Sequence, residues 1–450
     1  MSAIYLISLT AISIIVLLLL IIVLRIHAFI SLLLVSLGVA IAGGIPISEI
    51  TDTIQEGMGG TLGYIAIVIG IGTMIGEMLQ VSGGARQIAD TIIKSFGERK
   101  APWALSSIGI IVAIPVFLEV ALILFIPLVY DMARRTGKSV LYYGIPLVAG
   151  FAVAHSFIPP TPGPVAVAAL IGADLGWVIF LGFLSGIPAV IIGGVYWGKF
   201  IGNRIHAEVP EAMISKIPSD EDGASKRPPG FGIAISIIVI PLVLILSNTA
   251  TNVWLPEEHS AAVIMSLVGH PFSALLIAVI LGFYFLGTRL GFTREEMLQV
   301  ATRSMQPVGM IILLTGAGGV FGNVLVTTGI GDVLVDIMDA SNLPVIIFAF
   351  IVATSIRVSQ GSATVAMVTT AGLIAPVIEA GDFSAPMVAA VTIAIACGAT
   401  VLSHVNDTGF WMVKEFMGLT EKQTLMSWTV METIIGIIGL IMILLISLFL

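Results

Sequence analysis

The sequence predicts an all-α polytopic membrane protein built from two inverted-topology repeats, each with about five transmembrane helices, a re-entrant hairpin and a broken helix. Three observations predict this fold class. The composition is that of a membrane protein, many apolar stretches are long enough to cross a bilayer, and a pattern of glycines recurs about half a chain apart.

Composition places the chain in the membrane class. Of its 450 residues, 58% are hydrophobic and only 10% are charged, and the mean hydropathy is +1.11. Soluble globular proteins carry about 25% charged residues. The net charge of −8 argues against binding of nucleic acid, and the single cysteine, Cys397, excludes an intrachain disulfide. The apolar stretch 3–24 is long enough to span and no basic segment precedes it, so we expect a first transmembrane helix rather than a cleaved signal peptide.

Ten apolar stretches have the length of a membrane span. They occupy residues 3–24, 27–47, 61–81, 139–173, 175–198, 231–248, 271–288, 306–328, 385–413 and 425–450. Two further stretches, 103–130 and 344–378, hold prolines or polar residues at their centres. We expect these two to be re-entrant hairpins or broken helices, which are tolerated only where the chain is buried in protein or lines a cavity.

The basic residues predict the orientation. With the N-terminus outside and neither hairpin crossing the membrane, the cytoplasmic loops hold 18 of the 19 Lys and Arg residues, as the positive-inside rule requires. Both termini are then expected in the periplasm, and the opposite loops carry acids such as Glu49 and Asp52. Arg357 is the one cation that this topology leaves unexplained, and a charge at membrane depth usually faces a partner or a water-filled cavity. The predicted cytoplasmic loops lie around residue 25 and at 82–102, 131–138, 199–230, 289–303 and 414–422.

An internal repeat relates the two halves of the chain. After a four-residue deletion the segment 115–119 aligns with 357–361. Each half holds five spans and one hairpin, an odd number, so the second half must be inverted relative to the first. Such repeats, with broken helices at matching positions, are typical of secondary transporters and locate their binding site. The predicted boundaries are 1–198 for the first repeat, 199–230 for a cytoplasmic linker and 231–450 for the second repeat. Gly70, Gly72, Gly76, Leu79, Gly83 and Asp90 recur 246 residues later as Gly316, Gly318, Gly322, Leu325, Gly329 and Asp336.

Two polar breaks lie in the first repeat. Ile114-Pro-Val-Phe-Leu-Glu119 combines a proline, which removes a helix donor, with the carboxylate of Glu119. This segment is either a functional break or a structural kink in which Glu119 forms hydrogen bonds with the backbone groups that the proline leaves unpaired. His155-Ser-Phe-Ile-Pro-Pro-Thr-Pro-Gly-Pro164 holds four prolines in six residues, so its backbone is free to meet a ligand. His155 suits a proton relay, and a packing role is the alternative.

The other two breaks lie in the second repeat. Ser355-Ile-Arg-Val-Ser-Gln-Gly-Ser-Ala-Thr364 presents the guanidinium of Arg357, a planar fork that matches a carboxylate, among hydroxyl and amide groups. The competing interpretation is an internal ion pair of Arg357 with Glu119 or Asp407, and the two are compatible if the pair opens when substrate arrives. Ser403-His-Val-Asn-Asp-Thr-Gly409 places imidazole, amide, carboxylate and hydroxyl groups at bilayer depth, which favours a functional role.

At these breaks the sequence resembles the gluconate permease family, a branch of the ion-transporter superfamily with paired hairpins. The similarity runs nearly end to end. It implies a secondary active transporter, proton-coupled and of the symport type, that takes up gluconate or a related sugar acid across the bacterial inner membrane. Members of the family also handle idonate, fructuronate, glycerate and D-serine. The matching motifs are Gly59-Gly-Thr-Leu-Gly63, Gly83-Gly-Ala85, Pro159-Pro-Thr-Pro-Gly-Pro164, Gly361-Ser-Ala-Thr-Val-Ala366 and Ser403-His-Val-Asn-Asp-Thr-Gly-Phe-Trp411.

Three positions depart from the pattern of the gluconate-type members of that family. Those members have His where this chain has Thr161, and two apolar residues where it has Ser359 and Gln360. These changes alter the hydrogen-bonding capacity of the expected site. The resemblance therefore predicts a small organic anion and leaves the individual hydroxy acid open.

The expected site lies near the bilayer midplane, between the hairpin tips and the breaks at 155–164 and 403–409. Arg357 is expected to bind the substrate carboxylate, while hydroxyl and amide side chains bind its hydroxyl groups. The coupled proton is expected on Glu119, Asp407, His155 or His404, the titratable side chains of the central breaks. The full set expected to contact substrate is Arg357, Ser359, Gln360, Gly361, Ser362, Thr364, Thr161, Gly163, His404, Asn406 and Thr408.

Other functions fit the sequence less well. A membrane enzyme would need a metal or diphosphate site, and the His-Glu-x-x-His pattern is absent, so we expect neither catalysis nor a cofactor nor a metal. A passive channel would share the polar pore, but the inverted repeat favours alternating access. Sodium coupling stays open as an alternative to proton coupling, because freed carbonyls and hydroxyls can hold Na⁺. The superfamily resemblance also implies a homodimer.

Overall fold

The computed structural model describes residues 3–97, 100–210, 228–256, 258–306, 308–329, 333 and 343–450, and its regular structure within these ranges is helical throughout. The first part contains α1 (Ala3–Leu18), η1 (Leu19–Val23), α2 (Ala28–Ala42), α3 (Ile47–Val81), α4 (Gly84–Phe96), α5 (Ala101–Ala113), α6 (Leu118–Thr136), α7 (Val140–Phe157), α8 (Pro162–Ile171), α9 (Leu175–Ala189), η3 (Val190–Tyr196) and α10 (Trp197–Arg204). The second part contains α12 (Phe231–Trp254), α13 (Ser260–Val268), α14 (Pro271–Gly282), η4 (Phe283–Gly287), η5 (Thr288–Leu290), α15 (Arg294–Ser304), α16 (Val308–Thr327), α18 (Val345–Gln360), α19 (Ala363–Ala380), α20 (Ala385–Thr400), α21 (Thr408–Phe416), α22 (Glu421–Thr424), η6 (Leu425–Thr429) and α23 (Val430–Ser447).

Several of these helices, alone or end to end, are long and apolar enough to cross a membrane. In the described part of the chain there are eight such stretches, accompanied by shorter apolar helices such as α2, α5, α18 and α20. The predicted class, an all-α polytopic membrane protein, is confirmed. The eight stretches are Ile47–Val81, Val140–Ile171, Leu175–Arg204, Phe231–Trp254, Pro271–Leu290, Arg294–Thr327, Ala363–Ala380 and Glu421–Ser447.

All four polar segments interrupt helices. Pro115 and its neighbours separate α5 from α6, and the proline-rich loop after Phe157 separates α7 from α8. Gly361 ends α18 with φ +92°, a left-handed conformation that glycine adopts readily, and Ser362 then caps α19. The segment between Thr400 and Thr408 separates α20 from α21. The breaks predicted from proline, glycine and charge are therefore present.

The helices also differ from the predicted stretches in places. The stretch predicted at 61–81 is the second part of α3, so Glu49 and Asp52 lie in the first turns of a helix and not in a loop. Helix α4 occupies a segment predicted as a cytoplasmic loop, because Ala85, Ile88 and Ile92 recur at helical spacing and are buried. Helix α15 does the same at 294–304, where Thr293 and Glu296 form a capping box.

The order of elements recurs along the chain at a nearly constant interval. Helix α3 ends at Val81 and α16 ends at Thr327, 246 residues later, which is the interval of the glycine pattern. The N-caps of α7 and α20 are Ser139 and Ser384, 245 residues apart. The N-caps of α8 and α21 are Thr161 and Asp407, 246 residues apart. Thr161 and Asp407 therefore occupy corresponding places in the two halves of the sequence.

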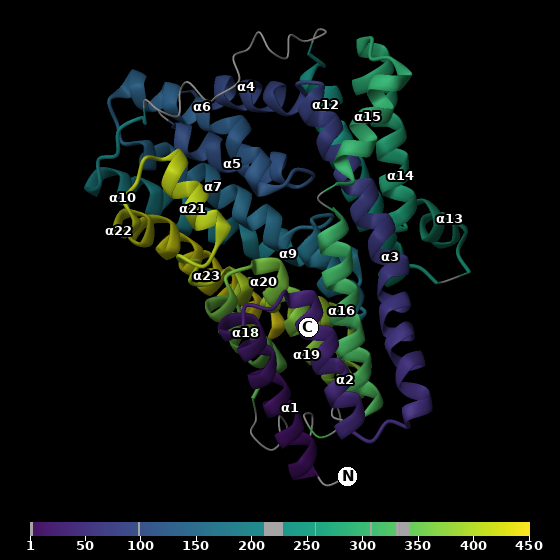
Figure 1. Cartoon of the computed structure of the whole chain (residues 1–450). Helices are drawn as coiled ribbons and strands as arrows, with labels where there is room; N and C mark the ends of the chain where they lie inside the picture. Colours follow the sequence, from purple (N-terminus) through teal and green to yellow (C-terminus); the bar gives the residue numbers. More distant parts are fainter. Residues whose placement is uncertain are drawn as a thin grey trace.

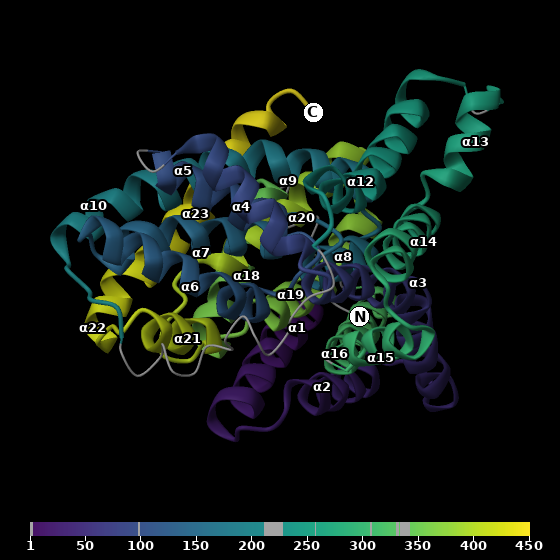
Figure 2. The ribbon, with the colours of Figure 1, turned by 90° about the horizontal axis from the view of Figure 1, so that it is seen from above.

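The packing brings helices from both parts of the chain together. The long helix α3 runs along one side of the molecule and packs against α16 and α14, while α16 packs against α19 (Figure 1). Helix α18 packs against α20, and α20 packs against α23 and α9. Helix α13 lies at the periphery beside α14 (Figure 2). The helices that carry the polar breaks thus pack against one another, although the segment between α20 and α21 has exposed residues such as Leu402 and Val405.

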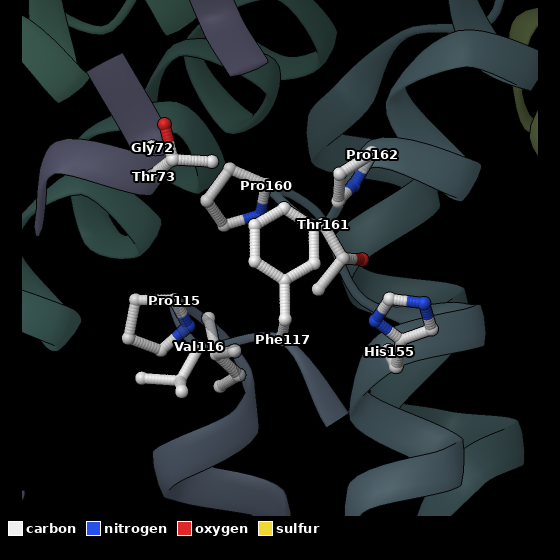
Figure 3. A pocket seen from close by; sticks show the side chains of 10 residues that line it. Gly72, Thr73, Pro115, Val116, Phe117, His155, Pro160, Thr161 and Pro162 are labelled. Carbon is white, nitrogen blue, oxygen red and sulfur yellow. The ribbon is translucent and has the colours of Figure 1, made fainter. Parts of the chain in front are cut away.

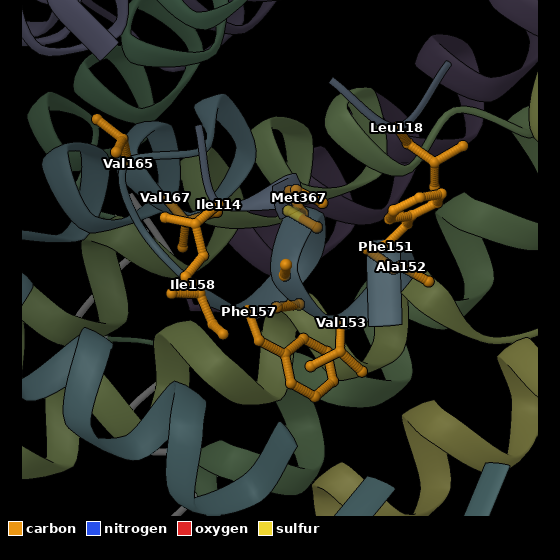
Figure 4. Packing of buried hydrophobic residues seen from close by; sticks show 14 of the residues in the cluster. Ile114, Leu118, Phe151, Ala152, Val153, Phe157, Ile158, Val165, Val167 and Met367 are labelled. Carbon is orange, nitrogen blue, oxygen red and sulfur yellow. The ribbon is translucent and has the colours of Figure 1, made fainter. Parts of the chain in front are cut away.

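Close packing holds the helix before the first break. Helices α5 and α7 approach so closely that a Cβ on Gly109 would lie 2.8 Å from the Cα of Gly150, a contact that only glycine permits at this position. Leu118 of α6, Phe157 of α7 and Met367 of α19 are all buried in the same apolar core (Figure 4). Leu118 of α6 and Ala152 of α7 line one cavity together with Ala363 and Thr364 at the start of α19, where the polar groups of the second part gather.

Candidate functional site

An ion pair lies beside the break between α18 and α19. Nη2 of Arg357 is 2.6 Å from Oδ2 of Asp407, and Arg357 is only 3% exposed. Asp407 also caps α21 by accepting the backbone N–H of Gly409 at 3.1 Å, and Ser403 donates its hydroxyl to Oδ2. Trp428 donates its indole N–H to that hydroxyl oxygen at 2.7 Å. These bonds hold the carboxylate in place, and the structure contains the Arg357–Asp407 pair that the sequence left open.

Arg357 keeps donors that the protein does not satisfy. Neither Nε nor Nη1 has a hydrogen-bond partner among the described residues. A guanidinium carries five N–H donors in a fixed plane, and these two nitrogens carry three of them. Buried donors are normally bonded, and leaving one unsatisfied costs about 1–3 kcal/mol. The unsatisfied edge of Arg357 therefore suits a planar anion that accepts two hydrogen bonds.

A cavity of about 200 Å³ adjoins Arg357. It is large enough for several water molecules or one small solute. The cavity takes its walls from both parts of the chain. They are formed by Leu118, Ala152, His155 and Ser156 from the first part, and by Arg357, Gln360, Gly361, Ser362, Ala363, Thr364, Asn406, Asp407, Thr408, Gly409, Trp428 and Glu432 from the second.

Two helices begin at this cavity. Ser362, the N-cap of α19, and Asp407, the N-cap of α21, both line it, as do the first helical residues Ala363 and Thr408. The N-terminus of a helix carries unpaired N–H groups and a partial positive charge, and it attracts anions. Because Asp407 already caps α21, the beginning of α19 and the unsatisfied edge of Arg357 are the parts of this wall that favour an added negative charge.

Hydrogen bonds tie the two breaks of the second part together. The carbonyl oxygen of Val358 lies 2.9 Å from Nε2 of His404 and 2.9 Å from Nδ2 of Asn406. Asn406 donates to this oxygen, and Nε2 of His404 donates to it when it carries the ring proton. A Cβ on Gly361 would overlap the backbone of Asn406, so this contact requires glycine. The position of Arg357 relative to Asp407 is thereby fixed by backbone contacts as well as by the ion pair.

A second, smaller cavity lies at the break between α5 and α6. It encloses about 10 Å³, room for about one water molecule, between Pro115 and Phe117 on one side and Pro160 and Thr161 on the other (Figure 3). His155 lines this cavity as well as the larger one, with its ring centroid 6.4 Å from that of Phe117. The hydroxyl of Thr161 donates to the carbonyl oxygen of Ile158 at 2.6 Å. This cavity is too small for an organic substrate.

The larger cavity brings together nine of the residues singled out in the sequence. They are His155, Arg357, Gln360, Gly361, Ser362, Thr364, Asn406, Asp407 and Thr408. Other predicted residues lie elsewhere: Thr161 lines the small cavity, and His404 bonds Val358. Ser359 donates to the carbonyl oxygen of Ser355 at 2.7 Å, and Gly163 packs against Met367. The side chain of Glu119 lies outside the described part of the structure.

Two functional side chains of the cavity lie outside all four of the polar breaks that were singled out in the sequence. Glu432 and Trp428 both come from the last apolar stretch and lie one helical turn apart. Glu432 is the one charged residue between positions 425 and 450, so the rule that drew attention to Arg357 would also have selected it. Among the described residues, no group of three or more His, Cys, Asp or Glu side chains is arranged to hold a metal ion.

Comparison with known proteins places this geometry in a family. A family model described as GntP family permease matches residues 5–449. The low-affinity gluconate transporter of Escherichia coli (strain K12) is 41% identical over 417 residues, which cover 93% of this chain and 92% of that protein. The inner membrane permease YgbN of the same organism is 38% identical over 446 residues, which cover 98% of each chain.

A solved structure shares the fold. The YdaH transporter of Alcanivorax borkumensis superposes with a TM-score of 0.64, and the match covers 93% of this chain and 98% of that one. The sequence identity is only 12%, so this likeness concerns the arrangement of helices. The family that the motifs indicated is confirmed, and so is a transport protein rather than an enzyme.

Proposed function

Because the chain belongs to the GntP family of permeases, we propose that it is a secondary active transporter that takes up gluconate or a related small sugar acid together with protons. The observation that carries this proposal is Arg357, buried at the wall of the larger cavity with the N–H groups of Nε and Nη1 unsatisfied. A carboxylate is the planar anion that matches such a fork. The names of the relatives, a low-affinity gluconate transporter among them, support a sugar acid.

The cavity wall supplies groups for the rest of such a molecule. The carboxylate would lie against Arg357, close to the beginnings of α19 and α21. Gln360, Ser362, Thr364 and Asn406 present amide and hydroxyl groups to the same cavity, and each can donate to or accept from a substrate hydroxyl. The Oε1 atom of Gln360 is buried without a partner, so it can accept a hydrogen bond from the substrate. A hydroxy acid is thus the class of anion that best satisfies this wall.

Coupling to protons is part of the proposal. Of the titratable side chains expected to carry the proton, Asp407 and His155 line the cavity, and His404 lies directly behind it against Val358. Glu119 belongs to the first turn of α6, next to Leu118 in the cavity wall. A permease that accumulates an anion against the membrane potential needs a coupled cation, and these side chains offer routes for H⁺.

We also propose the architecture in its finer form. Two inverted-topology repeats, 1–198 and 231–450, would be joined by a cytoplasmic linker at 199–230, with both termini in the periplasm and the whole in the bacterial inner membrane. The matching helix ends 245 or 246 residues apart and the distribution of basic residues support this arrangement. A relative named as an inner membrane permease supports the location. Assembly as a homodimer remains part of the same proposal.

Substrate-dependent proton flux tests the function. Purified protein in proteoliposomes is given gluconate, fructuronate, glycerate or D-serine, and proton entry is followed for wild type, Arg357→Ala and Arg135→Ala. Arg135 is the matched control, because its ion pair with Asp131 is exposed. Proton flux with one of these acids, abolished by Arg357→Ala and kept by Arg135→Ala, is the expected result. Uptake driven by sodium without proton flux would overturn the coupling, and full flux in Arg357→Ala would leave Arg357 a purely structural role.

A further inference from the structure

Glu432 is a buried carboxylate to which the proposed substrate site assigns no role. It lies in the first turn of α23, lines the larger cavity and is only 4% exposed. Its Oε1 atom has no hydrogen-bond partner among the described residues. A carboxylate that is buried, faces a cavity and lacks a full set of donors is costly in its ionised form. Such groups occur most often at functional sites, where a change in their charge is part of the mechanism.

Charged groups converge on Glu432 from the second part of the chain. Arg357 and Asp407 line the same cavity, so their charges act on Glu432 across a short distance. Trp428, one turn earlier on the same face, is joined to Asp407 through the hydroxyl of Ser403. Proton uptake at Glu432 therefore changes the field at the place where a substrate carboxylate would lie.

Few other titratable groups face this part of α23. Helix α7 contributes His155 to the same cavity, and its other titratable residues, Tyr142 and Tyr143, lie near its opposite end. Helix α20 contributes the buried Cys397, which packs against α23 one and two turns beyond Glu432. Helix α9 carries no titratable side chain, and η3 carries only the exposed Tyr196.

The charges of the cavity can be counted. Arg357 and Asp407 neutralise each other, so with Glu432 protonated the three groups are neutral together, and with Glu432 ionised they carry one net negative charge. A bound substrate anion adds another. Two unbalanced negative charges beside the buried side chains of Arg357 and Glu432 repel each other, because burial reduces the screening of their interaction. Substrate binding and proton uptake at Glu432 therefore favour each other.

Asp407 is less suited to exchange a proton. Its carboxylate already accepts hydrogen bonds from Arg357, Ser403 and the backbone of Gly409. Protonation would weaken the charge-assisted bond with Arg357 and the cap of α21. Glu432 has no such set of donors on Oε1, so an O–H bond can form there without the loss of an existing contact.

We propose that Glu432 is the side chain that carries the coupled proton. It takes a proton from water when the substrate anion binds beside Arg357, and it returns the proton to water on the other side of the membrane when the anion leaves. This inference rests on the proposed function and identifies the residue responsible for its coupling.

The test separates coupling from transport. Glutamine resembles the protonated acid in shape and charge, so Glu432→Gln is expected to exchange labelled gluconate for unlabelled gluconate across a proteoliposome membrane. It is expected to lose accumulation driven by a pH gradient. Glu379→Gln, the same change at the exposed end of α19, is the matched control and is expected to keep both activities. Accumulation by Glu432→Gln at the wild-type level would overturn the inference.

A measurement of binding covers the case in which the variant exchanges poorly. Gluconate is added to detergent-solubilised protein in weak buffer, and the protons taken up are counted for each anion bound. Wild type is expected to take up about one and Glu432→Gln none, since linkage requires a change in bound protons. An equal uptake in both proteins would refute the role of Glu432. If Glu432→Gln neither binds nor exchanges gluconate, Glu432→Asp takes its place. The pH profile of transport by Glu432→Asp is expected to be shifted from that of wild type. An unshifted profile would refute the role of Glu432. If wild type neither binds gluconate nor moves protons with any acid of the panel, the proposed function fails first.

Discussion

Replacement of Arg357 by lysine separates the charge of this residue from its shape. Lysine keeps one positive charge in the buried wall beside Asp407, so the ion pair that ties α18 to α21 is retained. It removes the planar fork, however, and with it the N–H groups of Nε and Nη1 that the protein leaves unsatisfied. The variant therefore tests substrate recognition without leaving a buried carboxylate unpaired.

The expected loss follows from the number of hydrogen bonds. A carboxylate bound by the fork accepts two charge-assisted bonds, and lysine replaces them with about one. Such a bond contributes about 1.5–3 kcal/mol, so the KM for the substrate should rise roughly 10- to 100-fold. Arg357→Ala should behave differently, because an unpaired Asp407 costs up to about 3–5 kcal/mol of stability.

Two measurements distinguish these outcomes. The KM for gluconate is taken from the initial rate of uptake into proteoliposomes, and the Tm of each detergent-solubilised variant is taken from thermal unfolding. Arg357→Lys should change KM with little change in Tm, whereas Arg357→Ala should lower Tm, and Arg357→Ala combined with Asp407→Asn should recover part of that loss. A lysine variant with wild-type KM would refute the reasoning that the fork binds the substrate.

Three further predictions concern other positions. Gly361→Ala places a Cβ at φ +92° against the backbone of Asn406. We therefore expect a loss of about 1–2 kcal/mol in stability, measured as a lower Tm, together with a fall in uptake. A wild-type Tm would contradict the close contact. Thr364→Val removes a hydroxyl from the cavity wall, so the KM for gluconate should rise several-fold, in line with about 0.5–1.5 kcal/mol for a neutral hydrogen bond, and an unchanged KM would exclude Thr364 from substrate contact. Asp174→Ala removes the N-cap of α9 and the partner of the Thr249 hydroxyl. The Tm should fall by the equivalent of about 1–2 kcal/mol while the KM for gluconate stays unchanged. A changed KM would show that α9 contributes to the site.

The positions of the helix breaks could be predicted from the sequence more accurately than the contacts that form at these breaks. Pro115 and Gly361 have local effects on the backbone, so their positions could be read directly. The partner of Arg357 could not be chosen between Glu119 and Asp407, because pairing across 50 residues or more depends on how the helices pack. Thr161 and His404, both expected at the substrate, bond backbone carbonyls next to the breaks in this structure. Breaks release carbonyl groups, and nearby polar side chains satisfy them first.

Other differences have the same origin in tertiary structure. Glu432 escaped notice because no proline or glycine next to it marks a break, although its charge alone was a sufficient signal. Helix α4 was taken for part of a loop because its charged residues outweigh a short apolar face, and that face is buried against the rest of the protein. A hydropathy average over a long window does not detect such a helix, whereas its helical periodicity does.

The division of the cavity walls affects the energy of any movement that opens the site. Arg357, Asp407 and Glu432 all belong to the segment after residue 344, while α6 and α7 contribute Leu118, Ala152, His155 and Ser156. The ion pair therefore lies entirely within the second part of the chain, and the opposite wall combines the apolar Leu118 and Ala152 with His155 and Ser156. A movement of α6 and α7 relative to the second part would admit water without separating the buried ion pair, so the work of pulling opposite charges apart would not enter the barrier to reorientation.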